Sequence, residues 1–146
     1  MSFLEIIETA RQSGDPSPLV QAVPYSRFLG LDAEVQGDEI IGVLRYGDHL
    51  VGNSLVSALH GGTLGALLES TAVFTLIMRS ETLRIPKTIT ITVEYLRSAG
   101  LRDTCARAEM TRLGRRIASV RAFAWQEDRD KPVAAANAHF LFKPEP

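Results

Sequence analysis

The sequence predicts one α+β domain in which an antiparallel sheet curls around a single long buried helix. Two observations predict this arrangement. Residues 61–78 form one long apolar segment rich in helix formers, and four segments after it have strand character. In three of those strands small residues, mostly alanine, alternate along one face, so the sheet can approach whatever it packs on. The length of 146 residues, 45% of them apolar, suits a single domain over residues 1–146.

A short helix is expected at the N-terminus. The segment 2–5 (SFLE) has the S-x-x-E form of a capping box, so the helix should run to about Gln12. A glycine and two prolines within 14–18 end it. Residues 1–24 are therefore expected to be a helical extension in front of the main body of the domain.

Two strands are expected next, over 25–35 and 39–46. The turn signal Gln36-Gly37-Asp38 separates them. The following segment, 48–58, is mixed in character and is expected to be a loop.

The segment 61–78 is expected to be the central helix. Its apolar residues lie on nearly every side, which is typical of a helix that is surrounded. Gly65 is its weak interior point, and Glu69 is the only charged residue in it. The helix should end near Arg79.

Four strands are expected after the helix, over 88–93, 103–113, 116–126 and 133–142. The first of them alternates strictly with a period of two. The shared inward face of the other three is predicted to consist of Ala106, Ala108, Met110, Ala118, Val120, Ala122, Ala124, Ala134, Ala136 and Ala138.

Composition excludes several classes of protein. A net charge of −1 argues against a dedicated nucleic-acid binder. No membrane partner is expected, because the apolar segment 61–78 carries a charge near its centre and falls short of about 20 residues. The N-terminus lacks the form of a signal peptide, and the single Cys105 suits a reducing cytoplasm. The three histidines show no metal-ligand spacing, so we expect no metal.

Three features carry candidate chemistry. His60-Gly61-Gly62 directly precedes the helix, whose first N–H groups lack internal partners and favour an oxygen that gains negative charge. Glu69 is a carboxylate on an enclosed helix, which is costly unless it is paired or used. Thr88 starts the alternating strand and is expected to share a face with Thr90 and Thr92. Each feature also has an explanation without a catalytic role. His60-Gly61-Gly62 would be only a tight turn, Glu69 would point to water, and Thr88 would reflect the strand propensity of threonine.

Three segments together resemble the hotdog-fold acyl-CoA thioesterases, most closely their PaaI-like, phenylacetic-acid-degradation branch. They are HGGTLGALLES (60–70), VEYLRSA (93–99) and GRRIASVRAFAWQEDRDKPVAAANAHFLF (114–142). The resemblance covers about residues 25–143. It implies the hotdog fold, an antiparallel sheet wrapped around one long helix, and hydrolysis of an acyl-CoA thioester.

The resemblance also implies roles for individual residues. The backbone N–H of Gly61 would bind the thioester oxygen, and His60 would shape the loop. Glu69 would be the catalytic carboxylate, acting as general base or as nucleophile. Thr88 would help to hold the attacking water, and Asn53 (or its neighbour in the loop, Ser54) would assist at the carbonyl.

The charge distribution suggests where the coenzyme A part of the substrate binds. Residues 1–78 carry a net charge of −6 and residues 79–146 carry +5. Three arginines flank Gly114 at an expected hairpin, and we expect Arg112, Arg115 and Arg116 to meet the phosphates. Gly62 would let the substrate approach the backbone. Solvated surface arginines are the alternative. Beyond coenzyme A itself, no cofactor is implied.

The spacing of Gly61 and Glu69 predicts the assembly. Eight residues of helix separate them by about 12 Å, too far for both to reach one carbonyl. Two antiparallel copies can supply the pair, so we expect a homodimer with composite sites, with further pairing into a homotetramer left open. Two other functions stay open: a non-catalytic acyl-CoA-binding hotdog protein and, less favoured, a hotdog dehydratase or hydratase.

Overall fold

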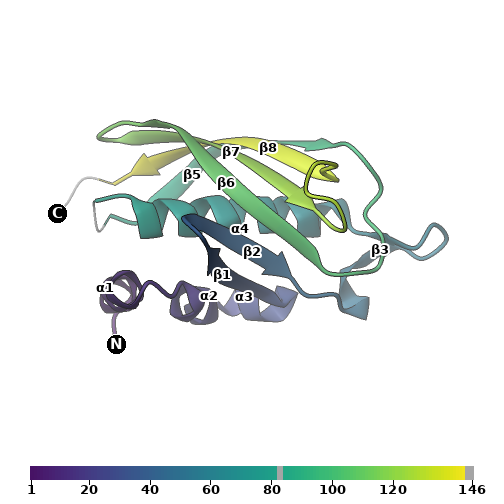
Figure 1. Cartoon of the computed structure of the whole chain (residues 1–146), viewed down its shortest axis with the longest axis horizontal. Coiled ribbons are helices and arrows are strands. Elements are labelled where there is room, and N and C mark those ends of the chain that lie inside the picture. Colours follow the sequence, from purple (N-terminus) through teal and green to yellow (C-terminus); the bar gives the residue numbers. More distant parts are fainter. Residues whose placement is uncertain (82–83, 144–146) are drawn as a thin grey trace.

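The computed structural model describes residues 1–81 and 84–143 and has the predicted fold (Figure 1). A six-stranded antiparallel sheet with strand order β1-β2-β6-β7-β8-β5 curls over the long helix α4. The helices are α1 (Phe3–Ser13), α2 (Ser17–Ala22), α3 (Pro24–Leu29), the 3-10 turn η1 (Asp48–Leu50) and α4 (Gly61–Arg79). The strands are β1 (Leu31–Gln36), β2 (Glu39–Leu44), β3 (Val51–Asn53), β4 (Ala58–Leu59), β5 (Pro86–Tyr95), β6 (Thr104–Leu113), β7 (Ile117–Trp125) and β8 (Ala134–Phe142).

The N-terminal segment is more helical than predicted. Helix α1 begins as expected, with the Ser2 hydroxyl accepting from the Glu5 N–H at 3.2 Å. The predicted strand over 25–35 is wrong in its first part, because Pro24–Leu29 forms the helix α3. Proline is favourable in the first turn of a helix, and Gly30 ends this one in a left-handed conformation (φ 80°). The strand therefore starts at Leu31.

The alanine-rich face of the sheet packs on α4 as predicted. Ala106, Ala118, Ala124 and Ala134 are completely buried in the two main core clusters. At Gly42 the backbone of β2 lies very close to α4, because a β-carbon there would overlap Thr71 Oγ1 and lie 3.3 Å from Leu67 Cδ1. Small residues thus determine how close the sheet lies to the helix.

The sheet covers α4 on one side only. Its buried residues include Leu64, Leu67, Leu68 and Leu76, whereas a stripe along the other side is partly or fully exposed. We call this stripe the open stripe; it consists of Gly62, Ala66, Glu69, Ser70 and Val73. Among the described residues no element covers this side, so the expectation that the helix is surrounded is not met within one chain.

Helix α4 is long and apolar enough to cross a membrane by length and composition alone. Half of its most apolar window is buried inside the protein. Its packing under the sheet identifies α4 as the core helix of a small soluble domain.

Strand β5 contains an irregularity that changes which way its threonines face. Thr88 is opposite Phe140 and Thr90 is opposite His139, with a register shift between the two. Phe140 is buried in the core and His139 is exposed, so Thr88 lies on the inward side while Thr90 lies on the outer side. The expectation that Thr88 shares a face with Thr90 and Thr92 is wrong, because a bulge shifts the alternation by one residue.

The close approach at Gly42 gives a stability prediction. Gly42→Ala should lower the free energy of unfolding by about 1–3 kcal/mol, because the new methyl group overlaps Thr71. Chemical denaturation of the single variants and of Gly42→Ala/Thr71→Ala measures the coupling. The double variant should lose less than the sum of the two singles, and strict additivity would show that Gly42 is not packed against Thr71.

Candidate active site

His60 caps the N-terminus of α4. Its Nδ1 accepts from the Gly62 N–H at 2.9 Å, and its carbonyl accepts from the N–H of Thr63 at 3.0 Å. Accepting at Nδ1 assigns the ring proton to Nε2. The Gly61 N–H, by contrast, has no acceptor within the described part of the chain. The first turn of α4 therefore presents one donor at the positive end of the helix dipole.

Tyr95, at the end of β5, lies against the same turn. Its hydroxyl donates to the Gly61 carbonyl at 3.0 Å, and a β-carbon on Gly61 would lie 3.0 Å from the Tyr95 ring. One turn along, a β-carbon on Gly65 would lie 3.8 Å from Val93. Sequence reasoning missed Tyr95 as a site residue. The tyrosine that ends the alternating strand within VEYLRSA was the available signal.

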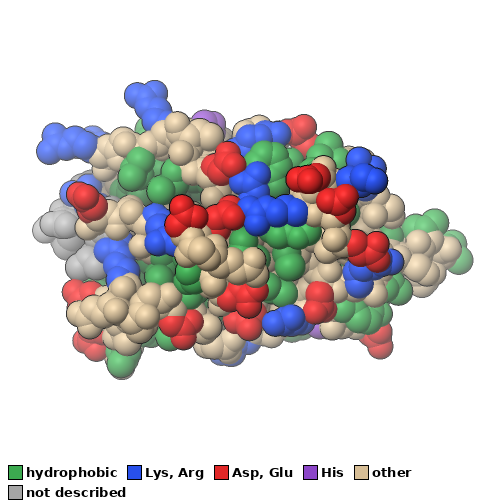
Figure 2. Space-filling view, viewed as in Figure 1, with side chains coloured by type: hydrophobic (Ala, Val, Ile, Leu, Met, Phe, Trp, Pro, Cys, Tyr) green, Lys and Arg blue, Asp and Glu red, His purple; other side chains and the backbone are tan. Residues whose placement is uncertain are grey.

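A short hairpin, β3–β4, precedes the cap. The His60 N–H donates to the Leu50 carbonyl at 2.8 Å, and Gly52 packs so closely that a β-carbon would lie 2.5 Å from the His60 Cα. Asn53 therefore lies near the cap, but its Oδ1 accepts from the Leu55 N–H at 3.0 Å and closes the turn. The hairpin projects from the end of the molecule, and hydrophobic atoms are visible at its tip (Figures 1 and 2).

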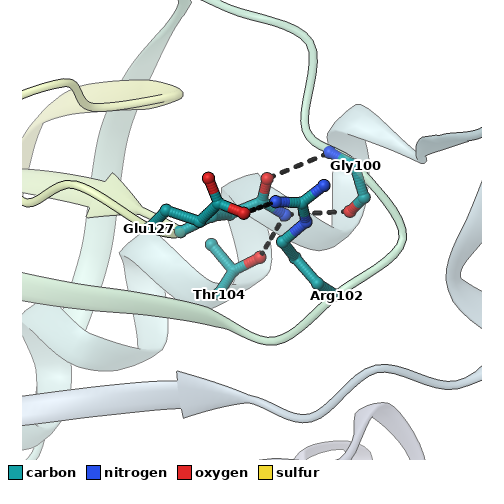
Figure 3. Close-up of polar contacts among 5 residues, drawn as sticks. Gly100, Arg102, Thr104 and Glu127 are labelled. Carbon is teal, nitrogen blue, oxygen red and sulfur yellow. Dashed lines mark hydrogen bonds and ion pairs between the residues drawn. The ribbon is translucent and has the colours of Figure 1, made fainter.

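The cap is supported by a loop in which side-chain hydrogen bonds hold the backbone of Gly100 (Figure 3). The Leu59 N–H donates to the Ala99 carbonyl at 3.0 Å. At the next residue, Gly100, the N–H donates to Gln126 Oε1 at 3.0 Å and the carbonyl accepts from Nε2 at 2.9 Å. Nε2 also donates to the buried Thr104 hydroxyl at 3.2 Å. One side-chain amide thus fixes the loop that positions β4 and the residue after it, His60.

Glu69 lies in the middle of the open stripe. It is half-buried and has no hydrogen-bond or ion-pair partner among the described residues. Strand β5 runs back along α4, from Tyr95 beside Gly61 to Val93 beside Gly65. At about 3.3 Å per strand residue and 1.5 Å per helical residue, inward-facing Thr88 lies about 10 Å, or about two helical turns, beyond Glu69 along α4.

The predicted phosphate-binding arginines lie at the other end of α4. Arg112, Arg115 and Arg116 are exposed at the hairpin between β6 and β7. A hollow of about 370 Å³ beside that hairpin is lined in part by Arg79 and Ser80, which end α4. Helix α4 is 19 residues long, so about 27 Å separates its ends. Within one chain the arginines and Gly61 are therefore far apart.

Two other titratable groups in the described part of the chain have raised pKa values. Burial raises the pKa of the Cys105 thiol, which makes it less reactive at neutral pH. A hydrogen bond to Asp48 raises the pKa of Tyr46, which keeps that phenol protonated. In residues 1–81 and 84–143 no three His, Cys, Asp or Glu side chains group as metal ligands would.

Comparison with known proteins supports the fold. The profile of the thioesterase superfamily matches residues 57–133, which include the cap, α4 and strands β5 to β7. A structure from Chromobacterium violaceum is 33% identical, with a TM-score of 0.77, and the match covers 96% of this chain and 98% of the other. No curated protein matches the chain.

Two further structures share the fold. A phenylacetic acid degradation-related protein from Ralstonia eutropha is 22% identical, with a TM-score of 0.73, over 86% of this chain and 98% of that one. A mutant of the phenylacetic acid degradation protein PaaI from Thermus thermophilus is 26% identical, with a TM-score of 0.68, over 83% and 100%. The expected resemblance to PaaI-like proteins and the expected hotdog fold are confirmed.

Removing the Gln126 amide should destabilise the loop around Gly100 that supports His60 at the N-terminus of α4. Gln126→Ala leaves Gly100 and the buried Thr104 hydroxyl without their partner, so the free energy of unfolding should fall by about 1–3 kcal/mol. Glu127→Ala is the matched control. It removes an exposed ion pair with Arg102 and should cost less than about 1 kcal/mol. Equal losses in urea denaturation would contradict the assigned role of Gln126.

Proposed function

Because the chain belongs to the thioesterase superfamily, we propose that it hydrolyses an acyl-CoA thioester to a free acid and coenzyme A in the cytoplasm. One observation carries the proposal. The same helix offers an N–H donor at Gly61 and, on its open side, a carboxylate at Glu69, neither of which has a partner among residues 1–81 and 84–143. A thioester needs both a donor for its oxygen and a group that delivers the nucleophile.

Gly61 is the electrophilic half of the site. Its N–H points from the positive end of α4 and would donate to the thioester oxygen as that oxygen becomes an oxyanion. His60 and Tyr95 hold the turn through the Gly62 N–H and the Gly61 carbonyl. Because the Gly62 N–H and the Gly61 carbonyl are both hydrogen-bonded to these side chains, the Gly61 N–H between them is held in place before substrate binds. Asn53 in the adjacent hairpin is the candidate second contact to the carbonyl.

Glu69 is the nucleophilic half of the site. As a general base, it takes a proton from a water held with the help of Thr88, and the hydroxide formed attacks the carbonyl carbon. The tetrahedral intermediate collapses by breaking the C–S bond, and the coenzyme A thiolate takes the proton from Glu69. Direct attack by the carboxylate, through an anhydride that water then hydrolyses, uses the same residue in the same place.

A two-fold dimer completes the site. Strand β5 ends the sheet and is ten residues long, and Ile89 and Tyr95 along it are 51% and 57% exposed. An unpaired edge of this length next to the open stripe is suited to pairing with a second copy. An antiparallel arrangement brings Gly61 of one protomer to Glu69 of the partner subunit. A homodimer therefore has two composite sites, and a homotetramer would pair two such dimers.

Glu69→Gln should lower kcat for acyl-CoA hydrolysis by about 100-fold or more, because the amide neither takes a proton nor attacks. The melting temperature should stay the same or rise, since a partly buried charge is removed. Thiol release measured over a panel of acyl-CoA substrates gives the rates. Glu8→Gln, an exposed site on α1, is the control for loss of charge. Near wild-type turnover of Glu69→Gln would exclude the proposed mechanism.

Complementation between two inactive variants tests the composite site. Gly61→Val places a side chain against the Tyr95 ring and over the free N–H, and Glu69→Ala removes the carboxylate. When the two variants are unfolded and refolded together, half of the dimers are mixed and each holds one intact site of two. About a quarter of wild-type activity should return. A site contained in one chain would return none.

A further inference from the structure

A second hollow lies on the outer face of the sheet, beside the β6–β7 hairpin. It has a volume of about 420 Å³. We call it the outer groove; its lining residues are Arg112, Gly114, Arg115, Ile117, Ser119 and His139. Neighbours of Ser119 and His139, such as Val120 and Ala138, are buried against α4. Because successive strand residues face opposite sides, Ser119 and His139 face away from the core.

The polar residues of the outer groove form a row across four strands. Arg112 on β6 is opposite Ser119 on β7, Ser119 is opposite His139 on β8, and His139 is opposite Thr90 on β5. The Ser119 hydroxyl and His139 Nδ1 lie 2.9 Å apart in a hydrogen bond. This bond orients the imidazole and leaves Nε2 for a ligand. Arg115 projects from the hairpin at the end of the row.

Among the described residues, the outer groove is lined by arginines and by no carboxylate. Two guanidinium groups belong to its lining, and the acidic side chains farther along the same face are paired with other arginines. Glu109 pairs with Arg107, and Glu94 pairs with Arg121. Guanidinium, hydroxyl and imidazole groups together are typical of a site for a phosphate monoester.

We propose that the outer groove binds the 3′-phosphate of coenzyme A, with Arg112, Arg115, Ser119 and His139 as its ligands. This inference rests on the proposed function. Gly114 and Arg115 line both the outer groove and the hollow at the C-terminal end of α4, so the two hollows meet at the hairpin. In an antiparallel dimer that end of the helix lies toward Gly61 of the other protomer. One protomer therefore supplies Gly61, and its partner supplies both the carboxylate and the phosphate site.

The structure separates Arg115 from Arg116, its neighbour of equal charge. Arg116 does not line the outer groove, and its carbonyl accepts from the Phe142 N–H at 2.7 Å. The two residues therefore carry the same charge but differ in whether they line the outer groove. Variants at Arg115 should weaken phosphate recognition more than variants at Arg116.

The kinetic test compares an acyl-CoA with the same acyl group on dephospho-CoA. The wild-type protein should have a KM at least tenfold lower for the phosphorylated substrate, with a similar kcat. Arg115→Ala and His139→Ala should bring the two KM values within twofold. Arg27→Ala, which removes an exposed arginine on α3, should keep the difference. Equal KM values in the wild type, or an unchanged ratio in both groove variants, would overturn the assignment.

Direct binding separates this inference from the proposed hydrolysis. Isothermal titration should show adenosine 3′,5′-bisphosphate binding at least tenfold more tightly than AMP, and Arg115→Ala should abolish that preference. If a protein that hydrolyses acyl-CoA binds both nucleotides equally, the phosphate site is wrong and the proposed function survives. If the preference is present but no thioester is hydrolysed, the phosphate site stands and the proposed function falls.

Discussion

The close packing of α4 against the small-residue face of the sheet determines where the other parts of the molecule lie. Alanines on β6, β7 and β8, and Gly42 on β2, bring the sheet within ordinary contact of the helix along one side. A sheet that curls around one side of a helix leaves the opposite side open. The half-exposed Glu69 on that side is a direct consequence of this packing, as is the unpaired edge of β5 beside it.

The same packing fixes the N-terminus of α4. Gly61 and Gly65 lack side chains, so β5 approaches the helix closely enough for the Tyr95 hydroxyl to reach the Gly61 carbonyl. His60 and the loop held by Gln126 close the turn from the other side. The result is a rigid donor whose neighbours are already bonded. A group fixed in this way needs no reorganisation when charge develops on an oxygen in front of it.

Much of the fold could be predicted from local patterns, and the failures have identifiable causes. The period of two and the alanine rows predicted four strands, and the apolar segment predicted α4. The strand predicted from residue 25 failed because Pro24 and Gly30 define a six-residue helix whose apolar residues also suit a strand. The bulge at Thr88 left no signal in a perfectly alternating sequence, because register depends on the partner strand.

The residues of the candidate site could likewise be predicted only in part from the sequence. Its motif residues, Gly61 and Glu69, could be found because they lie on one helix at a fixed spacing. Gln126 and the pair of Ser119 and His139 could not, because tertiary structure alone brings each to its partner. Side chains that act through contacts between distant segments carry no local periodicity, so only the pairing of the strands reveals them.

A site shared between protomers links substrate binding to assembly. In the proposed dimer one chain holds the oxyanion donor, and the carboxylate and the phosphate ligands belong to its partner. A substrate that contacts both chains binds the dimer and not the separated protomers, so it stabilises the dimer by RT ln(1 + [L]/Kd) for each site. At a substrate concentration of about 100 Kd this amounts to about 2.7 kcal/mol per site. In the proposed dimer the open stripe of α4 can therefore be partly hydrophilic at little cost, because bound substrate would supply part of the stability that a fully apolar interface would provide.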